Sequence, residues 1–220
     1  MRVAIAGAGN VGRSIASELV GNGHEVMLIE RHAAQLDPQD VPSAEWVHAD
    51  ACELGSLEEA GLERCDVVIS ATGDDKVNLV VSLLAKTEFA VRRVVARVND
   101  PHNEWLFTEA WGVDVAVSTP RIIAAVVEEA VSVGDLVRLM TLRQGQANLV
   151  EVTLPEDTPL AGRPVRELDL PTDAALVTIL RGGRVIVPLG DDALEGGDEL
   201  LFVAAAAVEP DVRAALHRAR

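Results

Sequence analysis

One motif near the start of the chain limits what the chain can fold into more than any other. The apolar run at residues 3–6 leads into the glycine motif at residues 7–12, GAGNVG, and helix-forming residues follow. In such a strand, turn and helix, Gly7 permits the tight turn, Gly9 lets the backbone approach a pyrophosphate, and Gly12 lets the helix lie close to the strand. The phosphates then lie at the positive end of the helix. The motif predicts a dinucleotide site; the alternative is a glycine turn that serves only packing.

An acidic residue stands at the distance that such a site requires. A second predicted strand, residues 25–29, is followed by Glu30. A carboxylate about 20 residues beyond the glycine motif binds the ribose hydroxyls of a dinucleotide. Glu30 is therefore the predicted ribose ligand.

The composition excludes several classes of partner. The 220 residues carry 19 basic and 35 acidic side chains, a net charge of -16, which argues against binding to nucleic acid or to an anionic membrane surface. No apolar run approaches the roughly 18 residues of a membrane-spanning helix. The chain begins almost directly with a predicted strand, and its two cysteines, Cys52 and Cys65, are too few for a disulfide framework. We expect a cytoplasmic protein with free, buried thiols.

The first part of the chain alternates between strand and helix patterns. The apolar runs predict strands at residues 46–50, 66–71, 94–98 and 113–117, and the intervening segments predict helices at residues 54–60, 75–86 and 104–111. Asp74 can cap the helix at residues 75–86. This alternation predicts an α/β fold, a Rossmann-like doubly wound parallel sheet.

The chain changes character after this part. Thr119 and Pro120 predict the start of a helix at residues 121–133 whose apolar face needs a partner. We predict a nucleotide-binding domain at residues 1–133, a helical connection at residues 134–143 and a C-terminal domain at residues 144–220. One-sided strand patterns, a glycine-pair hairpin at residues 181–184 and a terminal helix at residues 211–218 predict a small α+β fold for this last domain.

Ligands of doubly wound sheets bind at the carboxyl ends of the strands. The residues at these positions are Glu30, Asp50, Ala51, Thr72, Gly73 and Arg97. Arg97 can contact a phosphate or can pair with Asp50 or Asp100, and the sequence leaves both open. Asp50 can equally be an ordinary acid at a strand end.

The sequence argues against an enzyme and against a metal site. A dehydrogenase needs a proton donor and acceptor near the nicotinamide, yet residues 144–220 contain no Ser, Cys or Lys, and the chain has no Tyr. We therefore predict no catalytic residue, although Asp, Glu or Arg can fill that role in principle. His24, His32, His48 and His102 follow no metal-ligand spacing and are predicted to be surface histidines.

Several further motifs resemble one family. They are the glycine motif, the segment 23–30 (GHEVMLIE), Ala49-Asp50-Ala51, residues 71–75 (ATGDD) with Asn78, residues 96–101 (ARVNDP), and, in the second domain, residues 159–162, 166–171 and 194–200. The chain is thereby similar to the TrkA-type nucleotide-binding subunits of bacterial potassium uptake systems, which are built from regulator-of-potassium-conductance (RCK) domains. The resemblance covers nearly the whole chain.

The resemblance implies a function and a set of ligand contacts. It implies a homo-oligomer, arranged as a ring, in which nucleotide binding shifts subunit geometry and gates a membrane-embedded potassium transporter. It implies that Gly7, Gly9, Asn10, Val11 and Gly12 hold phosphates, Glu30 the ribose, Asp50 and Ala51 the adenine, and Thr72, Gly73 and Arg97 the second half of the ligand. The C-terminal domain resembles the family's ligand-sensing domain.

The resemblance also bears on the choice of nucleotide. ATP-responsive members similar to the Ktr subunit carry arginine where this chain has Asn10. The absence of this arginine favours NAD or NADH over ATP or ADP. Two alternatives to a potassium-gating subunit stay open at this point: a small NAD-dependent oxidoreductase, and a nucleotide-sensing regulator of a different membrane partner.

Overall fold

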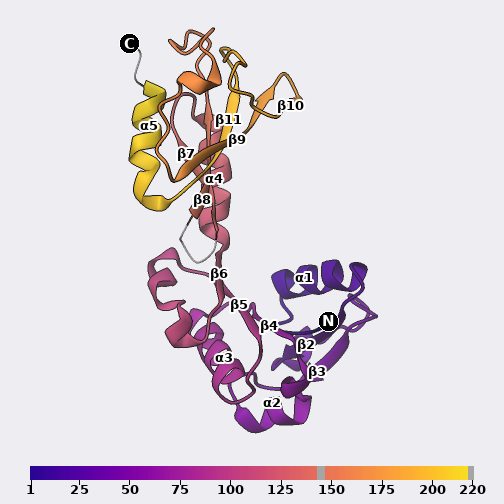
Figure 1. Cartoon of the computed structure of the whole chain (residues 1–220). Coiled ribbons are helices and arrows are strands. Elements are labelled where there is room, and N and C mark those ends of the chain that lie inside the picture. The colour runs from indigo at the N-terminus through magenta and orange to yellow at the C-terminus, as the bar shows by residue number, and fades with distance from the viewer. Residues whose placement is uncertain (143–146, 218–220) are drawn as a thin grey trace. The chain divides into compact units, whose positions relative to one another are not determined.

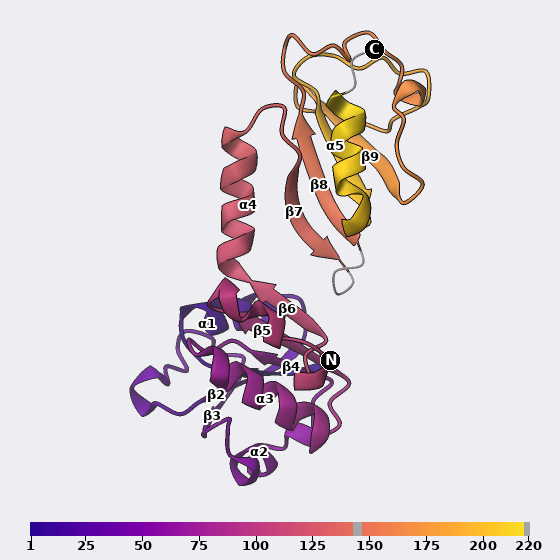
Figure 2. The same cartoon turned by 90° about the vertical axis from the view of Figure 1, so that its left-hand side faces the viewer.

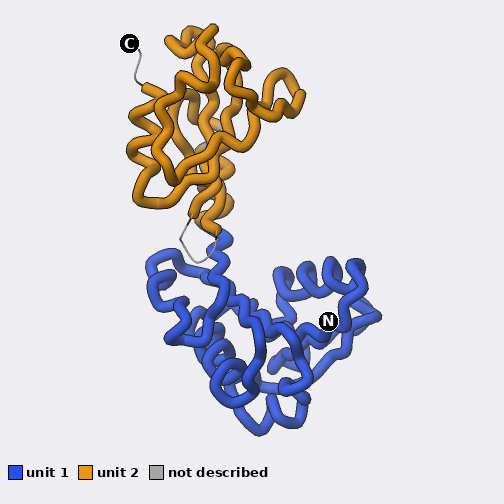
Figure 3. Tube along the Cα trace, in the orientation of Figure 1, with its two compact units in different colours: residues 1–120 blue, residues 121–220 orange. Residues whose placement is uncertain are grey.

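The computed structural model describes residues 1–142 and 147–217. It divides into two compact units, Met1–Pro120 and Arg121–Arg220, called here the N-terminal and the C-terminal unit (Figure 3). Residues 144–146, where the sequence places the start of the C-terminal domain, lie outside the described residues, so the predicted domain bounds stay a prediction. Within the described ranges, every helix is too short or too polar to cross a membrane.

The N-terminal unit is built on a six-stranded sheet in which every neighbouring pair is parallel. The strands are β1 (Arg2–Ala6), β2 (Glu25–Glu30), β3 (Glu45–His48), β4 (Val67–Ser70), β5 (Arg93–Val98) and β6 (Val115–Ser118). Their spatial order is β3-β2-β1-β4-β5-β6. This is the doubly wound order, which reverses direction between β1 and β4. The predicted Rossmann-like fold is confirmed.

Helices cover both faces of this sheet. They are α1 (Asn10–Gly21), α2 (Leu54–Ala60) and α3 (Asp75–Thr87), and Figures 1 and 2 show α1 on the opposite side of the strands from α2 and α3. Alternate residues of β1 face the two layers: Val3 and Ile5 pack with Ala16 of α1, whereas Ala4 and Ala6 share a cluster with residues of α2 and α3. Two-sided burial explains why β1 is wholly apolar after Arg2.

The predicted helix at residues 104–111 is wrong. This segment forms two 3-10 helices, Pro101–Leu106 and Glu109–Trp111. Between them Phe107 leaves the helical backbone conformation, and its side chain is buried in a cluster with Leu79, Ala96 and Val98. The burial of this one aromatic side chain outweighs the helix pattern of its neighbours. The other short 3-10 helices are Ala33–Gln35, Leu62–Arg64, Val165–Glu167 and Ala206–Val208.

The C-terminal unit contains a five-stranded antiparallel sheet in the order β10-β9-β11-β8-β7. Its strands are β7 (Val137–Leu142), β8 (Ala147–Thr153), β9 (Ala174–Arg181), β10 (Arg184–Ile186) and β11 (Glu199–Ala204), and its terminal helix is α5 (Glu209–His217). Val212 and Leu216 of α5 pack into the core that the sheet supplies. Gly182 and Gly183, both at positive φ, form the predicted hairpin turn between β9 and β10. The predicted α+β fold is confirmed.

The predicted helical connection at residues 134–143 is also wrong. Val137–Leu142 is strand β7, which pairs antiparallel with β8 over the register Val137↔Glu151 to Leu142↔Ala147. A short apolar run has no pattern that separates helix from strand, so the partner strand decides. The helix before it, α4 (Thr119–Val131), agrees with the sequence.

Candidate functional site

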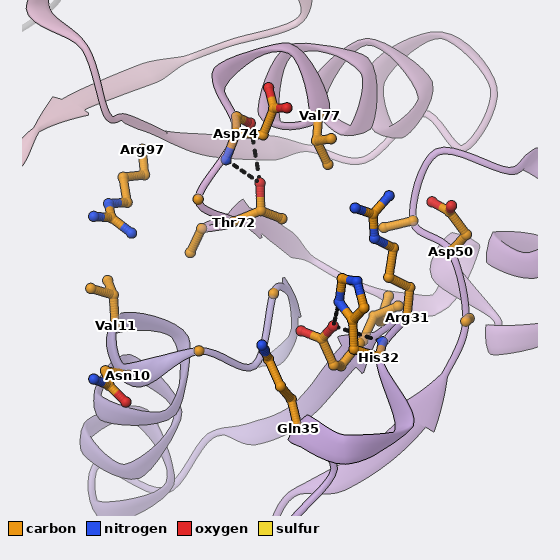
Figure 4. A pocket seen from close by; sticks show the side chains of 18 residues that line it. Asn10, Val11, Arg31, His32, Gln35, Asp50, Thr72, Asp74, Val77 and Arg97 are labelled. Atoms are coloured by element: carbon orange, nitrogen blue, oxygen red, sulfur yellow. Dashed lines mark hydrogen bonds and ion pairs between the residues drawn. The ribbon is translucent and has the colours of Figure 1, made fainter.

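A cavity of about 570 Å³ opens at the carboxyl ends of β1 to β5. It lies where the strand order reverses, the position at which doubly wound sheets bind ligands. All of the predicted ligand residues except Gly12 line it: Gly7, Gly9, Asn10, Val11, Glu30, Asp50, Ala51, Thr72, Gly73 and Arg97. Figure 4 shows Asn10 and Val11 on one wall, with Thr72 and Arg97 on another. Segments far apart in the sequence thus converge on one space.

The glycine motif shapes the wall of the cavity next to α1. Gly7 has a φ of 101°, and a Cβ on it would stand 2.9 Å from Thr72 Cα, so only glycine fits. Gly9, by contrast, has no atom within 4 Å of the position of a Cβ. It caps the N-terminus of α1, where free backbone N–H groups and the helix dipole favour an anion.

Gly12 has the packing role that the spacing of the glycine motif predicts. It is buried and does not line the cavity, and a Cβ there would overlap the carbonyl oxygen of Gly7. Gly12 therefore lets the first turn of α1 pack against the glycine loop. The phosphate contact that the resemblance implies for Gly12 stays a prediction.

The carboxylate of Glu30 is buried and hydrogen-bonded. Its Oε2 accepts the backbone N–H of Ala8 at 2.9 Å, and its Oε1 accepts the backbone N–H of His32 at 2.8 Å and lies 2.9 Å from His32 Nδ1. Burial acts to raise the pKa of Glu30, but the hydrogen bonds from His32 and Ala8 outweigh it, so the pKa lies below its usual range. An ionised Glu30 therefore ties the end of β2 to the glycine loop.

Asp50 and Ala51 line the cavity beyond the end of β3. Asp50 Oδ1 accepts the backbone N–H of Cys52 at 2.9 Å, a local turn that suits an ordinary acid at a strand end. The carboxylate still faces the cavity, where Figure 4 shows it at the same end as Arg31. Asp50 is thus placed for a ligand contact, and its role stays a prediction.

Asn78 links the two strand ends on the other side of the cavity. Its side chain is fully buried in α3, and its Oδ1 accepts both the backbone N–H and the hydroxyl of Thr72, at 2.9 and 2.7 Å. Its Nδ2 donates to the carbonyl oxygens of Thr72 and Arg97, at 3.3 and 2.8 Å. One side-chain amide therefore joins the loop after β4 to the end of β5.

Asp75 is a second buried polar group behind this wall. Its carboxylate accepts hydrogen bonds from the backbone of Asn99 and Asp100 and from the side chains of Asn99 and Asn103, at 2.7–3.0 Å. Burial alone would raise the pKa of Asp75, but these donors lower it below its usual range. The carboxylate fastens the start of α3 to the chain that leaves β5.

Arg97 has no ion pair among the described residues. Asp100, one of its two candidate partners, instead pairs with His102 at 2.9 Å, and Asp50 bonds to Cys52. The Nε atom of Arg97 is buried without a hydrogen-bond acceptor, and the side chain extends into the cavity opposite Val11 (Figure 4). The ion-pair alternative is therefore not observed, and a contact with a ligand phosphate remains.

Sequence reasoning missed part of the lining. The additional residues are Ile29, Arg31, His32, Gln35, Ala49, Ala71, Asp74 and Val77. Arg31 and His32 directly follow Glu30 at the end of β2, and this position could have predicted that they line the cavity. Gln35 lies in a 3-10 helix that no sequence pattern indicates. His32, predicted as a surface histidine, has a side chain that is 57% exposed and lines the cavity.

The arrangement suits binding of an anionic ligand with hydroxyl groups. The cavity offers a helix N-terminus and Arg97 for phosphates, and Glu30 and Asp50 as acceptors for hydroxyl or amine donors. In the described parts of the chain, no three His, Cys, Asp or Glu side chains are grouped so as to hold a metal ion. Cys65 is buried and Cys52 half-buried, both as free thiols.

Two domain models match this chain. Residues 3–119 match the TrkA-N domain, and residues 149–217 match the TrkA-C domain. The first match contains every residue that lines the cavity.

Curated relatives match along nearly the whole chain. The Trk system potassium uptake protein TrkA of Mycobacterium tuberculosis (strain H37Rv) is 68% identical over 212 residues, 96% of either chain. A TrkA homolog of Methanothermobacter thermautotrophicus is 30% identical over 91% of this chain and 92% of its own. The TrkA homolog of Archaeoglobus fulgidus is 29% identical, and the match covers 92% of this chain and 47% of that protein's length.

Solved structures share the fold. The GsuK channel bound to NAD aligns with 100% of this chain and 40% of its own, at a TM-score of 0.70 and 16% identity. GsuK bound to ADP aligns with 58% of this chain and 33% of its own, at a TM-score of 0.52 and 27% identity. The first likeness supports the fold alone.

Proposed function

The chain belongs to the TrkA family of potassium uptake proteins, and we propose that it is an NAD(H)-responsive regulatory subunit that gates a membrane-embedded potassium transporter. In this proposal the protein is cytoplasmic and reaches the inner face of the membrane through the transporter. It acts by binding and performs no chemical reaction.

The observation that carries this proposal is the convergence of the glycine loop, Glu30 and Arg97 on one cavity at the point where the sheet order reverses. The N-terminus of α1 and the unpaired Arg97 would hold the pyrophosphate, and Glu30 would accept the ribose hydroxyls. Asp50 and Ala51 would face the adenine, and Thr72 and Gly73 the second half of the ligand.

NAD or NADH is the proposed ligand, ahead of ATP or ADP. Asn10 at the start of α1 offers an uncharged amide, so the wall beside the glycine loop supplies no cation to a terminal phosphate there. Solved relatives with the same fold are described as bound to NAD and to ADP. The proposal therefore places NAD(H) first and treats the adenine mononucleotides as weaker ligands.

Gating requires only that the nucleotide bind two arrangements of the subunits with different affinity. A ligand shifts such an equilibrium by its differential affinity, typically about 1–3 kcal/mol. The hydrogen bond from the backbone of Ala8 to Glu30 braces one side of the cavity, and the bonds of Asn78 with Thr72 and Arg97 brace the other side. A ligand that contacts both sides can therefore change the spacing between them.

Self-association is part of the proposal. Helix α4 exposes Ile123, Val126, Val127 and Val131 by 54–76%. Contiguous exposed apolar side chains of this kind mark interfaces. We expect light scattering to show an oligomer at micromolar concentration, and a monomer with and without nucleotide would contradict this part.

The proposal is tested by titration and by transport. Calorimetry should show binding of NAD or NADH to the purified protein, with ATP and ADP weaker. Potassium flux through liposomes that contain the transporter of the same cell should change when the protein and NADH are added together. No effect of the protein on flux, with nucleotide binding intact, would favour a regulator of a different membrane partner.

A separate assay tests the non-enzymatic reading. NADH incubated with the protein and a panel of carbonyl compounds should keep its absorbance at the nicotinamide band. Sustained turnover would favour an oxidoreductase.

A further inference from the structure

The carboxylate that is proposed to bind the ribose has most of its acceptor sites filled. An ionised carboxylate offers about four lone-pair sites. Three N–H groups already approach Glu30: the backbone of Ala8 on Oε2, and the backbone and the imidazole of His32 on Oε1. A ribose diol brings two hydroxyl donors, so one of the three present donors must leave before both hydroxyls bind.

The imidazole of His32 is the donor that can leave. The other two donors are backbone N–H groups held by the glycine loop and by the chain after β2. The side chain of His32 is 57% exposed and lines the cavity, and Figure 4 shows its ring standing over the end of β2. Rotation about its side-chain bonds would free Oε1 of Glu30 without moving the fold.

We propose that His32 holds the place of a ribose hydroxyl on Glu30 and thereby lowers the nucleotide affinity of the site. The inference rests on the proposed nucleotide site. Because an ionised carboxylate can only accept, Nδ1 carries the hydrogen in the contact with Glu30. A ribose hydroxyl must displace this N–H before it can reach the same oxygen, so the hydrogen bond from His32 competes with the ligand.

His48 on β3 is a second imidazole near this strand end, and it serves as a control. Its Nε2 donates to the carbonyl oxygen of Arg31 at 2.9 Å, and it is not one of the side chains that line the cavity.

The chain contains a matched control for the local geometry. Asp100 and His102 repeat the arrangement of Glu30 and His32: the acid accepts the backbone N–H of the histidine two residues later, and its oxygen lies 2.9 Å from Nδ1. This second pair does not line the cavity. If the histidine only stabilised the local turn, substitution of either histidine would leave nucleotide affinity unchanged. Under the proposal, substitution of His32 changes nucleotide affinity and substitution of His102 does not.

The test is calorimetric titration of the full chain with NAD. His32→Ala removes the competing N–H, so it should bind about two- to fivefold more tightly than wild type, the range that one displaced hydrogen bond supports. His32→Gln keeps an N–H donor on its side chain, so it should bind like wild type.

His102→Ala and His48→Gln should bind NAD with the wild-type affinity. Thermal denaturation checks that each variant is folded. His32→Ala that binds no more tightly than wild type would overturn the inference while leaving the nucleotide site in place. If wild type binds neither NAD nor NADH, the proposed function and this inference both fail.

Discussion

Two glycines of the same motif should respond in different ways to one added methyl group. Gly9 has an ordinary φ of -71°, and no atom lies within 4 Å of its Cβ position, so Gly9→Ala places a methyl group in open space beside the cavity. A Cβ at Gly12 would stand 3.0 Å from the carbonyl carbon of Gly7 and closer still to its oxygen. The first variant tests the approach of a ligand, and the second tests the packing of α1.

The magnitudes follow from these surroundings. Replacing a glycine whose φ other residues can adopt stabilises a protein by about 0.4–1 kcal/mol. Alanine is a poorer helix cap than glycine by a comparable amount. The two effects oppose each other, so Gly9→Ala should leave the free energy of unfolding within about 1 kcal/mol of wild type. Its methyl group occupies the approach of the pyrophosphate, and we expect at least about a tenfold loss of NADH affinity, or 1.4 kcal/mol. Gly12→Ala should cost about 1–3 kcal/mol of stability, the usual range for overpacking.

Denaturant unfolding and calorimetric titration with NADH measure both quantities on the same samples. Gly9→Ala should be stable and weak in binding, and Gly12→Ala unstable. Wild-type affinity in Gly9→Ala would show that no ligand approaches this backbone. Wild-type stability in Gly12→Ala would show that α1 does not contact the loop as described.

Further predictions concern ribose selectivity, acid stability and the two units. In calorimetry, wild type should bind NADH more tightly than NADPH, because a 2′-phosphate beside the ionised Glu30 costs about 1–2 kcal/mol after screening. Glu30→Ala should lose NADH affinity, and its ratio of NADH to NADPH affinity should move toward one. Hydrogen bonds lower the pKa of Asp75 in the folded protein. The ionised carboxylate therefore contributes its full stabilisation above about pH 4, the pKa in the unfolded chain, and this contribution disappears as the pH falls through the lower pKa of the folded protein. In urea unfolding, Asp75→Ala should cost about 2–3 kcal/mol at pH 7 and less near pH 2. Equal losses at both pH values would contradict that role. A fragment of residues 1–133 contains the whole cavity and leaves no part of β7 unpaired, so it should bind NADH like the full chain, and a folded fragment without binding would refute this.

The sequence by itself determined the parallel fold and the place of the site. Strands buried on both faces produce apolar runs, and the glycine motif and Glu30 each follow such a run. Their convergence at one sheet edge follows from the alternation of strand and helix. The capping of α3 by Asp74, which accepts the N–H of Lys76, was likewise predictable because a cap depends on neighbours in the chain.

Only the tertiary structure decided the features that depend on distant partners. Strand β7 exists because β8 supplies its hydrogen bonds, and Phe107 breaks a helix because a core receives its side chain. Arg97 makes no ion pair among the described residues because Asp50 and Asp100 have other partners. Glu30 meets Ala8 across 22 positions of sequence, a contact that no local pattern records. Local patterns record burial and turn chemistry, whereas contacts between residues far apart in the chain form only when the sheet brings its strand ends together.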